Sequence, residues 1–146
     1  MTKARMASAI AIGFIVSEVL AILVHGVVLN GEYEPFRGSL LRSGASWQMV
    51  FLSAAHLSYV VALVWICSRV SFEGSVPARG AKLGVLGWMA GQAPVWLLWY
   101  GEQPWPGQLL LEQLVLEFVS SLLLGVTIAA VVGSASRRRM DVAVHT

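Results

Sequence analysis

Four long stretches of this chain are filled with apolar side chains, and short polar segments separate them. The stretches cover residues 6–29, 47–68, 83–100 and 109–132. Crossing a hydrocarbon core about 30 Å thick takes roughly 20 helical residues, which these lengths approach or exceed. Glycine and proline gather in the connections, where they favour turns. The pattern predicts an all-α fold: an antiparallel four-helix transmembrane bundle over residues 1–146, ending in a cytoplasmic tail at 133–146.

Composition agrees with a membrane environment. Apolar residues make up 57% of the chain and charged residues only 12%, whereas a soluble domain carries roughly 25% charged residues. The single cysteine, Cys67, lies in an apolar stretch, so an intrachain disulfide and a cysteine zinc cage are both excluded.

The start of the chain resembles a signal sequence because Lys3 and Arg5 precede an apolar run. That run continues for more than 20 residues, which is too long for a signal core. We therefore expect a retained signal anchor that also serves as the first span.

Lysine and arginine predict the orientation. Eight of the ten basic residues fall on one side of the predicted membrane: Lys3, Arg5, Arg69, Arg79, Lys82, Arg137, Arg138 and Arg139. Only Arg37 and Arg42 fall on the other side. Both termini should therefore be cytoplasmic. Aromatic residues, among them Tyr33 and Trp105, form an expected belt at the outer interface.

Small residues recur at helical spacing in two of the stretches. They are Ala9, Gly13, Ser17 and Ala21 in the first, and Gly84, Gly87 and Gly91 in the third. Such ridges allow helix backbones to approach closely in lipid. We expect both ridges to pack inside the bundle. A docking face for another subunit on the third helix is the alternative.

Polar side chains interrupt the apolar stretches at a few positions. The candidate intramembrane site consists of Glu18, His25, His56, Gln92 and Glu117. Glu18 and His25 are seven residues apart, close to two helical turns, so both should leave one face of the first helix. At a rise of ~1.5 Å per residue, the set is biased toward the outer half of the membrane.

Charge makes this set informative. No Lys or Arg lies deep in any span, and a charged side chain at the bilayer centre costs from ~2.5 to more than 10 kcal/mol. The glutamates should therefore be protonated, paired to histidine, solvated in a cleft or bound to a cation. Each of these residues could instead have a purely structural role, in which its side chain forms an interhelical hydrogen bond. For Gln92 the structural role would be a hydrogen bond to the backbone carbonyl that Pro94 leaves without a partner.

Metal and haem are further alternatives. Imidazole and carboxylate at His25, His56, Glu18 and Glu117 suit several metal ions, although no Glu-x-x-His pair typical of di-iron bundles occurs. A haem b held by His25 and His56 would need ligands at one depth. The two histidines differ by roughly 7 Å in depth at the helical rise, which is awkward for a haem.

Enzyme motifs are missing from the sequence. It contains no Gly-x-Ser-x-Gly elbow, no His-Glu-x-x-His and no phosphate-binding glycine loop, which disfavours a hydrolytic enzyme. The basic run at 137–139 directly follows a span, so it indicates topology and anionic lipid rather than nucleic acid.

The first third, with Glu18, His25-Gly26 and Tyr33, together with Pro104-Trp105-Pro106 before the last stretch, resembles small uncharacterised four-helix integral membrane proteins of bacteria. The resemblance implies a multi-pass protein of the plasma membrane, in bacteria the inner membrane, and implies no activity.

Two functions follow as hypotheses. The first is a non-catalytic subunit or accessory factor that contacts the lipid bilayer and other membrane subunits. The second is a proton, cation or metal site formed by Glu18, His25, His56 and Glu117, and it requires these four side chains to converge.

Overall fold

The computed structural model describes residues 1–41 and 46–144, and helices dominate both ranges. The elements in chain order are α1 (Lys3–Ala21), η1 (Ile22–Val28), α2 (Asn30–Tyr33), η2 (Glu34–Phe36), α3 (Ser46–Arg69), α4 (Val76–Gly87), η3 (Trp88–Gln92), α5 (Ala93–Glu102) and α6 (Gly107–Val144). Two of them, η1 and η3, are π-helical and η2 is a 3₁₀ turn. The described ranges contain no β-strand, which confirms the all-α prediction.

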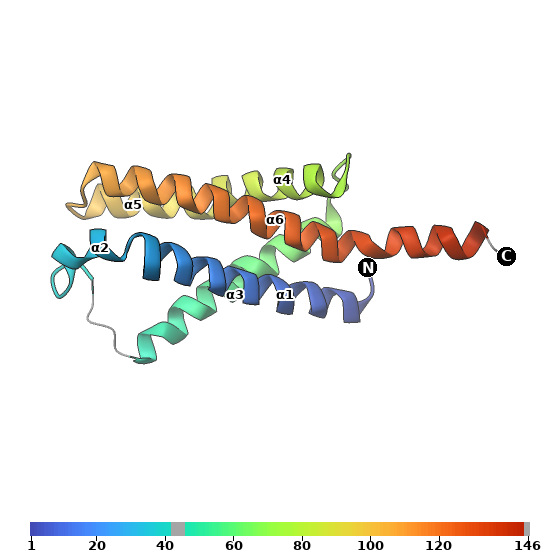
Figure 1. The fold of residues 1–146 in the computed structure, drawn as a ribbon, viewed down its shortest axis with the longest axis horizontal. Coiled ribbons are helices and arrows are strands. Elements are labelled where there is room, and N and C mark those ends of the chain that lie inside the picture. The colour runs from blue at the N-terminus through green and yellow to red at the C-terminus, as the bar shows by residue number, and fades with distance from the viewer. Residues whose placement is uncertain (42–45, 145–146) are drawn as a thin grey trace.

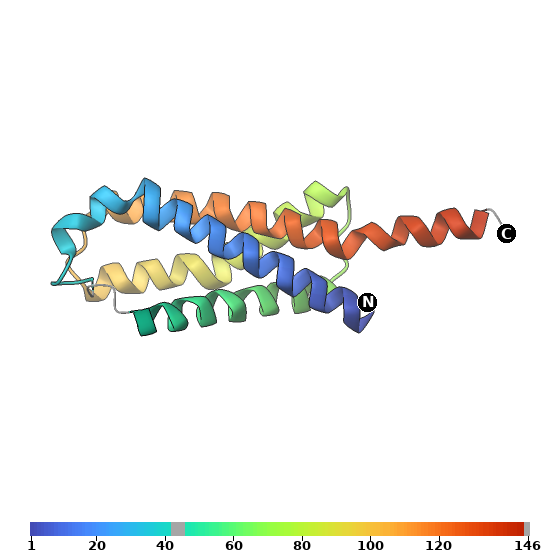
Figure 2. The same ribbon diagram turned by 60° about the horizontal axis from the view of Figure 1, so that its bottom comes forward.

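The long helical segments run up and down along one axis (Figures 1 and 2). α1 leads directly into η1, and α4, η3 and α5 form another unbroken helical rod. α6 lies centrally, with contacts to α1, α3, α4 and α5. Both termini lie toward one end of the molecule, and α2 and the turn between α5 and α6 lie at the other (Figure 1).

Three helices are long and apolar enough to cross a membrane: Lys3–Val28, Met49–Arg69 and Gly107–Gly133. The stretch predicted at 83–100 is not among them. It is divided among α4, η3 and α5, whose lengths of 12, 5 and 10 residues are each too short alone. The division comes from the π-helical segment Trp88–Gln92, which lies directly before Pro94, a residue without an N–H for the helical ladder.

The lateral surface of the molecule is apolar. Large exposed side chains include Ile15 at 62%, Phe51 at 67%, Leu98 at 61% and Leu111 at 62% of their full area, and they come from four different long segments. A water-soluble monomer does not expose apolar surface on this scale. The exposed apolar side chains therefore indicate a membrane protein, in agreement with the three apolar helices.

Glycine allows α4 and α6 to touch through their backbones. A Cβ atom on Gly84 would lie 2.4 Å from the Ser121 carbonyl oxygen, and one on Gly80 would lie 2.3 Å from the Cα atom of Val126. On α6, a Cβ atom on Gly125 would lie 2.3 Å from the Gly80 carbonyl oxygen. The two glycine-bearing surfaces therefore fit each other at a distance that no side chain permits.

The other small residues also face protein. Gly87 and Gly91 lie against the Tyr59 ring of α3, while Gly13 of α1 lies against Val60. Ala9 and Ser17 are buried on the same ridge of α1, and Ala21 is half-buried. The structure thus uses both small-residue ridges inside the molecule.

Two apolar clusters fill the interior at opposite ends. The cluster toward the termini, which we call the lower cluster, contains Ala9, Val60, Leu63, Val64, Leu83, Leu124 and Ile128. The cluster toward α2, which we call the upper cluster, contains Val24, Leu29, Tyr33, Trp105 and Leu109. The polar side chains of the spans occupy the layer between these clusters.

Some of the sequence predictions concern residues that lie outside the part of the chain that the structure describes. Arg42, counted for the orientation, lies in the segment 42–45. The side chains of Arg137, Arg138 and Arg139 are likewise not described. The backbone of the predicted tail is described to Val144 and continues α6 as helix.

Candidate functional site

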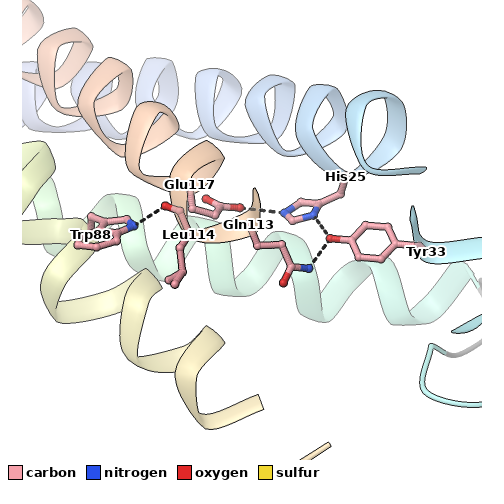
Figure 3. A network of polar contacts seen from close by, with 6 residues as sticks. All are labelled: His25, Tyr33, Trp88, Gln113, Leu114 and Glu117. Atoms are coloured by element: carbon pink, nitrogen blue, oxygen red, sulfur yellow. Dashed lines mark hydrogen bonds and ion pairs between the residues drawn. The ribbon is translucent and has the colours of Figure 1, made fainter. Parts of the chain in front are cut away.

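His25 is the centre of the larger of two polar groups in this layer. It projects from η1, and its Nε2 atom lies 2.8 Å from Oε1 of Glu117 on α6. Its Nδ1 atom lies 2.7 Å from the hydroxyl of Tyr33 on α2. The Tyr33 hydroxyl also accepts a 2.7 Å hydrogen bond from Nε2 of Gln113 (Figure 3). Four side chains from three elements are thereby linked in one chain.

Burial keeps this chain of side chains away from water at the end formed by Tyr33 and Gln113. Tyr33 retains 8% of its exposure and Gln113 retains 4%. Burial raises the pKa of Tyr33 to about 12, the Gln113 hydrogen bond opposes the rise, and the Glu117 carboxylate adds to it. Because the folded-state pKa lies far above neutrality, Tyr33 remains a hydroxyl donor at physiological pH.

One arrangement of protons satisfies every contact in the chain. If Nε2 of His25 carries the hydrogen, it donates to Oε1 of the Glu117 carboxyl group, and Nδ1 is free to accept from Tyr33. The Tyr33 oxygen in turn accepts from Gln113. All hydrogens then point toward Glu117. Reversal of the tautomer is the elementary step by which an imidazole passes a proton from one neighbour to another.

Glu18 and His56 form the second polar group. Oε1 of Glu18 on α1 lies 3.0 Å from Nδ1 of His56 on α3. The two side chains retain 28% and 26% of their exposure, so they lie at the edge of the packed interior. The other ring nitrogen of His56 has no hydrogen-bond partner among the described residues.

A small cleft of about 20 Å³ lies between the two pairs. His56 of one pair and Glu117 of the other both line it, and Gln92, Tyr59 and Ser121 supply further polar groups. A space of about 10–15 Å³ with two or more polar partners suffices for one water molecule. The cleft is therefore large and polar enough for a single water to join the two pairs.

Neighbouring contacts hold the walls of the cleft. The Tyr59 hydroxyl lies 3.2 Å from Oγ of Ser121. Nε1 of Trp88 donates a 3.1 Å hydrogen bond to the carbonyl of Leu114, which fixes η3 against α6 (Figure 3). The Trp96 ring lies 5.9 Å from that of His25, centroid to centroid, and limits the rotation of the imidazole.

Both π-helical segments contribute to the polar layer. η1 carries His25 and η3 carries Gln92. A π-helical turn widens the helix and changes the direction of the side chains that follow, and such turns are frequent at functional sites. In α1 and η1 this change explains why Glu18 and His25 bond different partners, although a straight helix would have placed them on one face.

The structure brings the predicted residues together as two pairs. His25 joins Glu117, Glu18 joins His56, and the cleft separates the pairs. Gln92 lines the cleft and does not bond a carbonyl freed by Pro94 in any described contact. Glu112 on the same helix as Glu117 stays outside the layer, where it accepts a 2.9 Å hydrogen bond from Gln108.

Four participants were not among the predicted site residues: Tyr33, Gln113, Tyr59 and Ser121. Tyr33 was assigned to the interfacial aromatic belt. Tyr33 follows His25 by eight residues. This spacing would have predicted a contact between the two side chains only if the turn after Leu29 had been known. Gln113 lies one helical turn before Glu117 on α6, and this i, i+4 relation could have identified it.

A resident metal or haem finds little support in the donor geometry. Among residues 1–41 and 46–144, no group of three or more His, Cys, Asp or Glu side chains is placed to hold a metal ion. Both ring nitrogens of His25 already engage a partner, so neither is available to an iron in this arrangement. His25 and His56 also bond different carboxylates instead of facing each other.

No protein-family model matches the chain, and comparison with curated proteins and with solved structures finds no similar protein.

Proposed function

We propose that this protein is a multi-pass four-helix bundle of the plasma membrane with both termini in the cytoplasm. The rod formed by α4, η3 and α5 supplies the fourth span, since it runs unbroken from Val76 to Glu102 and packs along α6. Eight of ten Lys and Arg residues on the side of the termini support the orientation. The upper cluster and α2 then face outward.

Its function, in this proposal, is to bind protons at an intramembrane Glu–His relay that is reached from the outer side. One observation carries the proposal: two carboxylate–imidazole pairs, held by α1 with η1, by α3 and by α6, each place one member on the same water-sized cleft. Proton relays within membranes are commonly built from hydrogen-bonded Glu and His side chains.

The relay moves a proton by one hydrogen-bond step at a time. A proton enters at the imidazole of His25, whose side chain retains 31% of its exposure, and the imidazolium then passes the proton on its Nε2 to Glu117. A water in the cleft carries the next step from Glu117 to His56, which bonds Glu18. Each transfer moves one proton from a donor to an acceptor, and the groups together gain the one proton that was taken up.

Electrostatics favours one proton for each pair. A carboxylic acid beside neutral imidazole and a carboxylate beside imidazolium are both neutral overall. Removal of that proton would leave a lone carboxylate in an apolar layer, where an uncompensated charge is costly. Below the cleft, the lower cluster contains only apolar side chains. In this proposal the relay ends at mid-membrane.

Infrared titration of the protein in vesicles tests this function. Right-side-out vesicles with a buffered interior are exposed to external pH changes, and the carbonyl stretch of protonated carboxyl groups is recorded. We expect a reversible carboxyl signal that Glu117→Gln removes and Glu18→Gln reduces.

Glu112→Gln is the matched control, because it changes the same residue type on the same helix outside the polar layer. It should leave the signal unchanged. A wild-type signal in Glu117→Gln, in protein with unaltered circular dichroism, would contradict the relay.

A role as a subunit of a larger membrane assembly is a second candidate that one observation favours. The side chains of Glu18, His25 and His56 retain 28%, 31% and 26% of their exposure. At mid-membrane depth that polar surface would meet hydrocarbon, which costs free energy unless another polypeptide covers it. Extraction in mild detergent followed by size determination tests this role, and a purely monomeric protein would count against it.

A further inference from the structure

A second cavity lies far from the polar layer, at the end of the molecule that holds the termini. Its volume is about 190 Å³. It is enclosed by the end of α3 and the following loop, by α4 and by α6. Apolar walls come from Val70, Phe72, Ala129 and Val132, and polar groups come from Cys67, Ser71 and Arg79.

Arg79 is the unusual member of this cavity. Its Nε atom is buried and has no hydrogen-bond partner. Among the described residues no carboxylate forms an ion pair with its guanidinium. Its Nη2 atom packs so closely on Gly133 that a Cβ atom there would lie 2.8 Å away. An unpaired Nε donor in a largely apolar pocket is costly, and an anionic group beside the partly buried guanidinium would satisfy it.

The depth of the cavity identifies the source of that anion. The apolar helix α3 ends beside it at Arg69, and the apolar part of α6 beside it is soon followed by the basic run Arg137–Arg139. The cavity therefore lies at the level where a bilayer passes from hydrocarbon to headgroup. Arginine matches the geometry of phosphate oxygens. The apolar walls suit the upper part of an acyl chain or a glycerol backbone better than they suit a free, fully hydrated anion.

We propose that this cavity is a binding site for an anionic phospholipid, with the headgroup phosphate accepting hydrogen bonds from Arg79. Ser71 adds a hydroxyl donor beside the phosphate. This site is independent of the Glu–His relay and does not require it. It places a specific lipid of the inner leaflet at the junction of α3, α4 and α6.

Native mass spectrometry with phosphatidylglycerol as the probe tests the proposal. We expect the wild-type protein to retain one phosphatidylglycerol with a preference of severalfold over phosphatidylcholine. Arg79→Gln should weaken this retention about tenfold, as expected for the loss of a charge-assisted hydrogen bond. Arg69→Gln is the control, because Arg69 lies 5.8 Å above the Trp65 ring outside the cavity and should bind as the wild type does.

Cys67, the single cysteine, lines the cavity and reports its occupancy in the unmodified protein. Bound phosphatidylglycerol should slow alkylation of Cys67 by N-ethylmaleimide severalfold, whereas phosphatidylcholine should slow it much less. This measurement tests whether the cavity binds phosphatidylglycerol even if Arg79→Gln does not fold. Equal protection by inorganic phosphate would overturn the lipid assignment in favour of a free-anion site. Equal retention by wild type and folded Arg79→Gln would overturn the site itself.

Discussion

Tyr33 is the residue that closes the end of the His25 polar group nearest α2. Its hydroxyl lies within 2.7 Å of both His25 and Gln113, and Gln113 is almost fully buried. Tyr33→Phe leaves the Gln113 amide without a partner, so we expect a loss of about 1–3 kcal/mol in unfolding free energy. Thermal unfolding in detergent measures it. Tyr100→Phe, at an exposed position, should change stability little, and an equal effect of both substitutions would contradict the network.

The same residue gives a pH dependence with a definite sign. The folded-state pKa of Tyr33 is about 12, against 10.0 for an ordinary tyrosine. A raised pKa means that the contribution of Tyr33 is complete below pH 10 and is lost as the pH rises toward 12. Over that interval the wild type should lose roughly 2–3 kcal/mol more stability than Tyr33→Phe. Parallel pH profiles for the two proteins would show that the hydroxyl is not buried as described.

Individual site residues could be chosen from the sequence, but their partners could not. Charge and apolar context single out Glu18, His25, His56 and Glu117 because ionisable groups in a span are rare. Which carboxylate meets which imidazole depends on the rotation of each helix about its axis. Helices that are apolar nearly all round carry little information about that rotation.

At the scale of helices, the closest contact is the crossing of α4 and α6. A Cβ atom on Gly84 would meet the α6 backbone at Ser121 and Leu122, and a backbone cannot move aside as a side chain can. We expect Gly84→Ala to destabilise the protein by about 1–3 kcal/mol, measured by thermal unfolding. It should also weaken the carboxyl infrared signal, because Ser121 lines the cleft.

Gly101→Ala is the matched control for this substitution. No atom lies within 4 Å of the position that its Cβ atom would occupy, and alanine favours a helix over glycine. The variant should be as stable as the wild type or slightly more so. If Gly84→Ala behaved in the same way, the contact between α4 and α6 would not be as close as the structure places it.

The glycine spacing in the third stretch indicated a close helix contact in advance, whereas the two π-helical segments had no recognisable signal. A π-helical turn is stabilised by packing around it and not by a residue preference along the chain. For that reason the sequence suggested a common face for Glu18 and His25, and the structure turns them toward different helices. Pro94 was the only sequence signal for the irregular helix between α4 and α5.

At the scale of the molecule, the polar layer lies between two apolar clusters, and this layering follows from the positions of polar residues along each span. The sequence therefore predicted the all-α class and a polar set biased toward one end of the helices. It could not predict how the segment after Leu29 folds back. That fold places Tyr33 over His25 and closes the layer with the upper cluster.

The orientation of the molecule decides which aqueous phase supplies the relay, and cysteine labelling in intact cells tests it. In a Cys67→Ser background, Glu102→Cys introduces a thiol at the end of the molecule near Tyr33, and Glu73→Cys introduces one at the end near Arg79. Both positions are exposed. A membrane-impermeant maleimide should label Glu102→Cys in intact cells and Glu73→Cys only after permeabilisation, since lysine and arginine concentrate on the side that we propose to be cytoplasmic. The reverse pattern would make the relay open to the cytoplasm and place the Arg79 cavity in the outer leaflet.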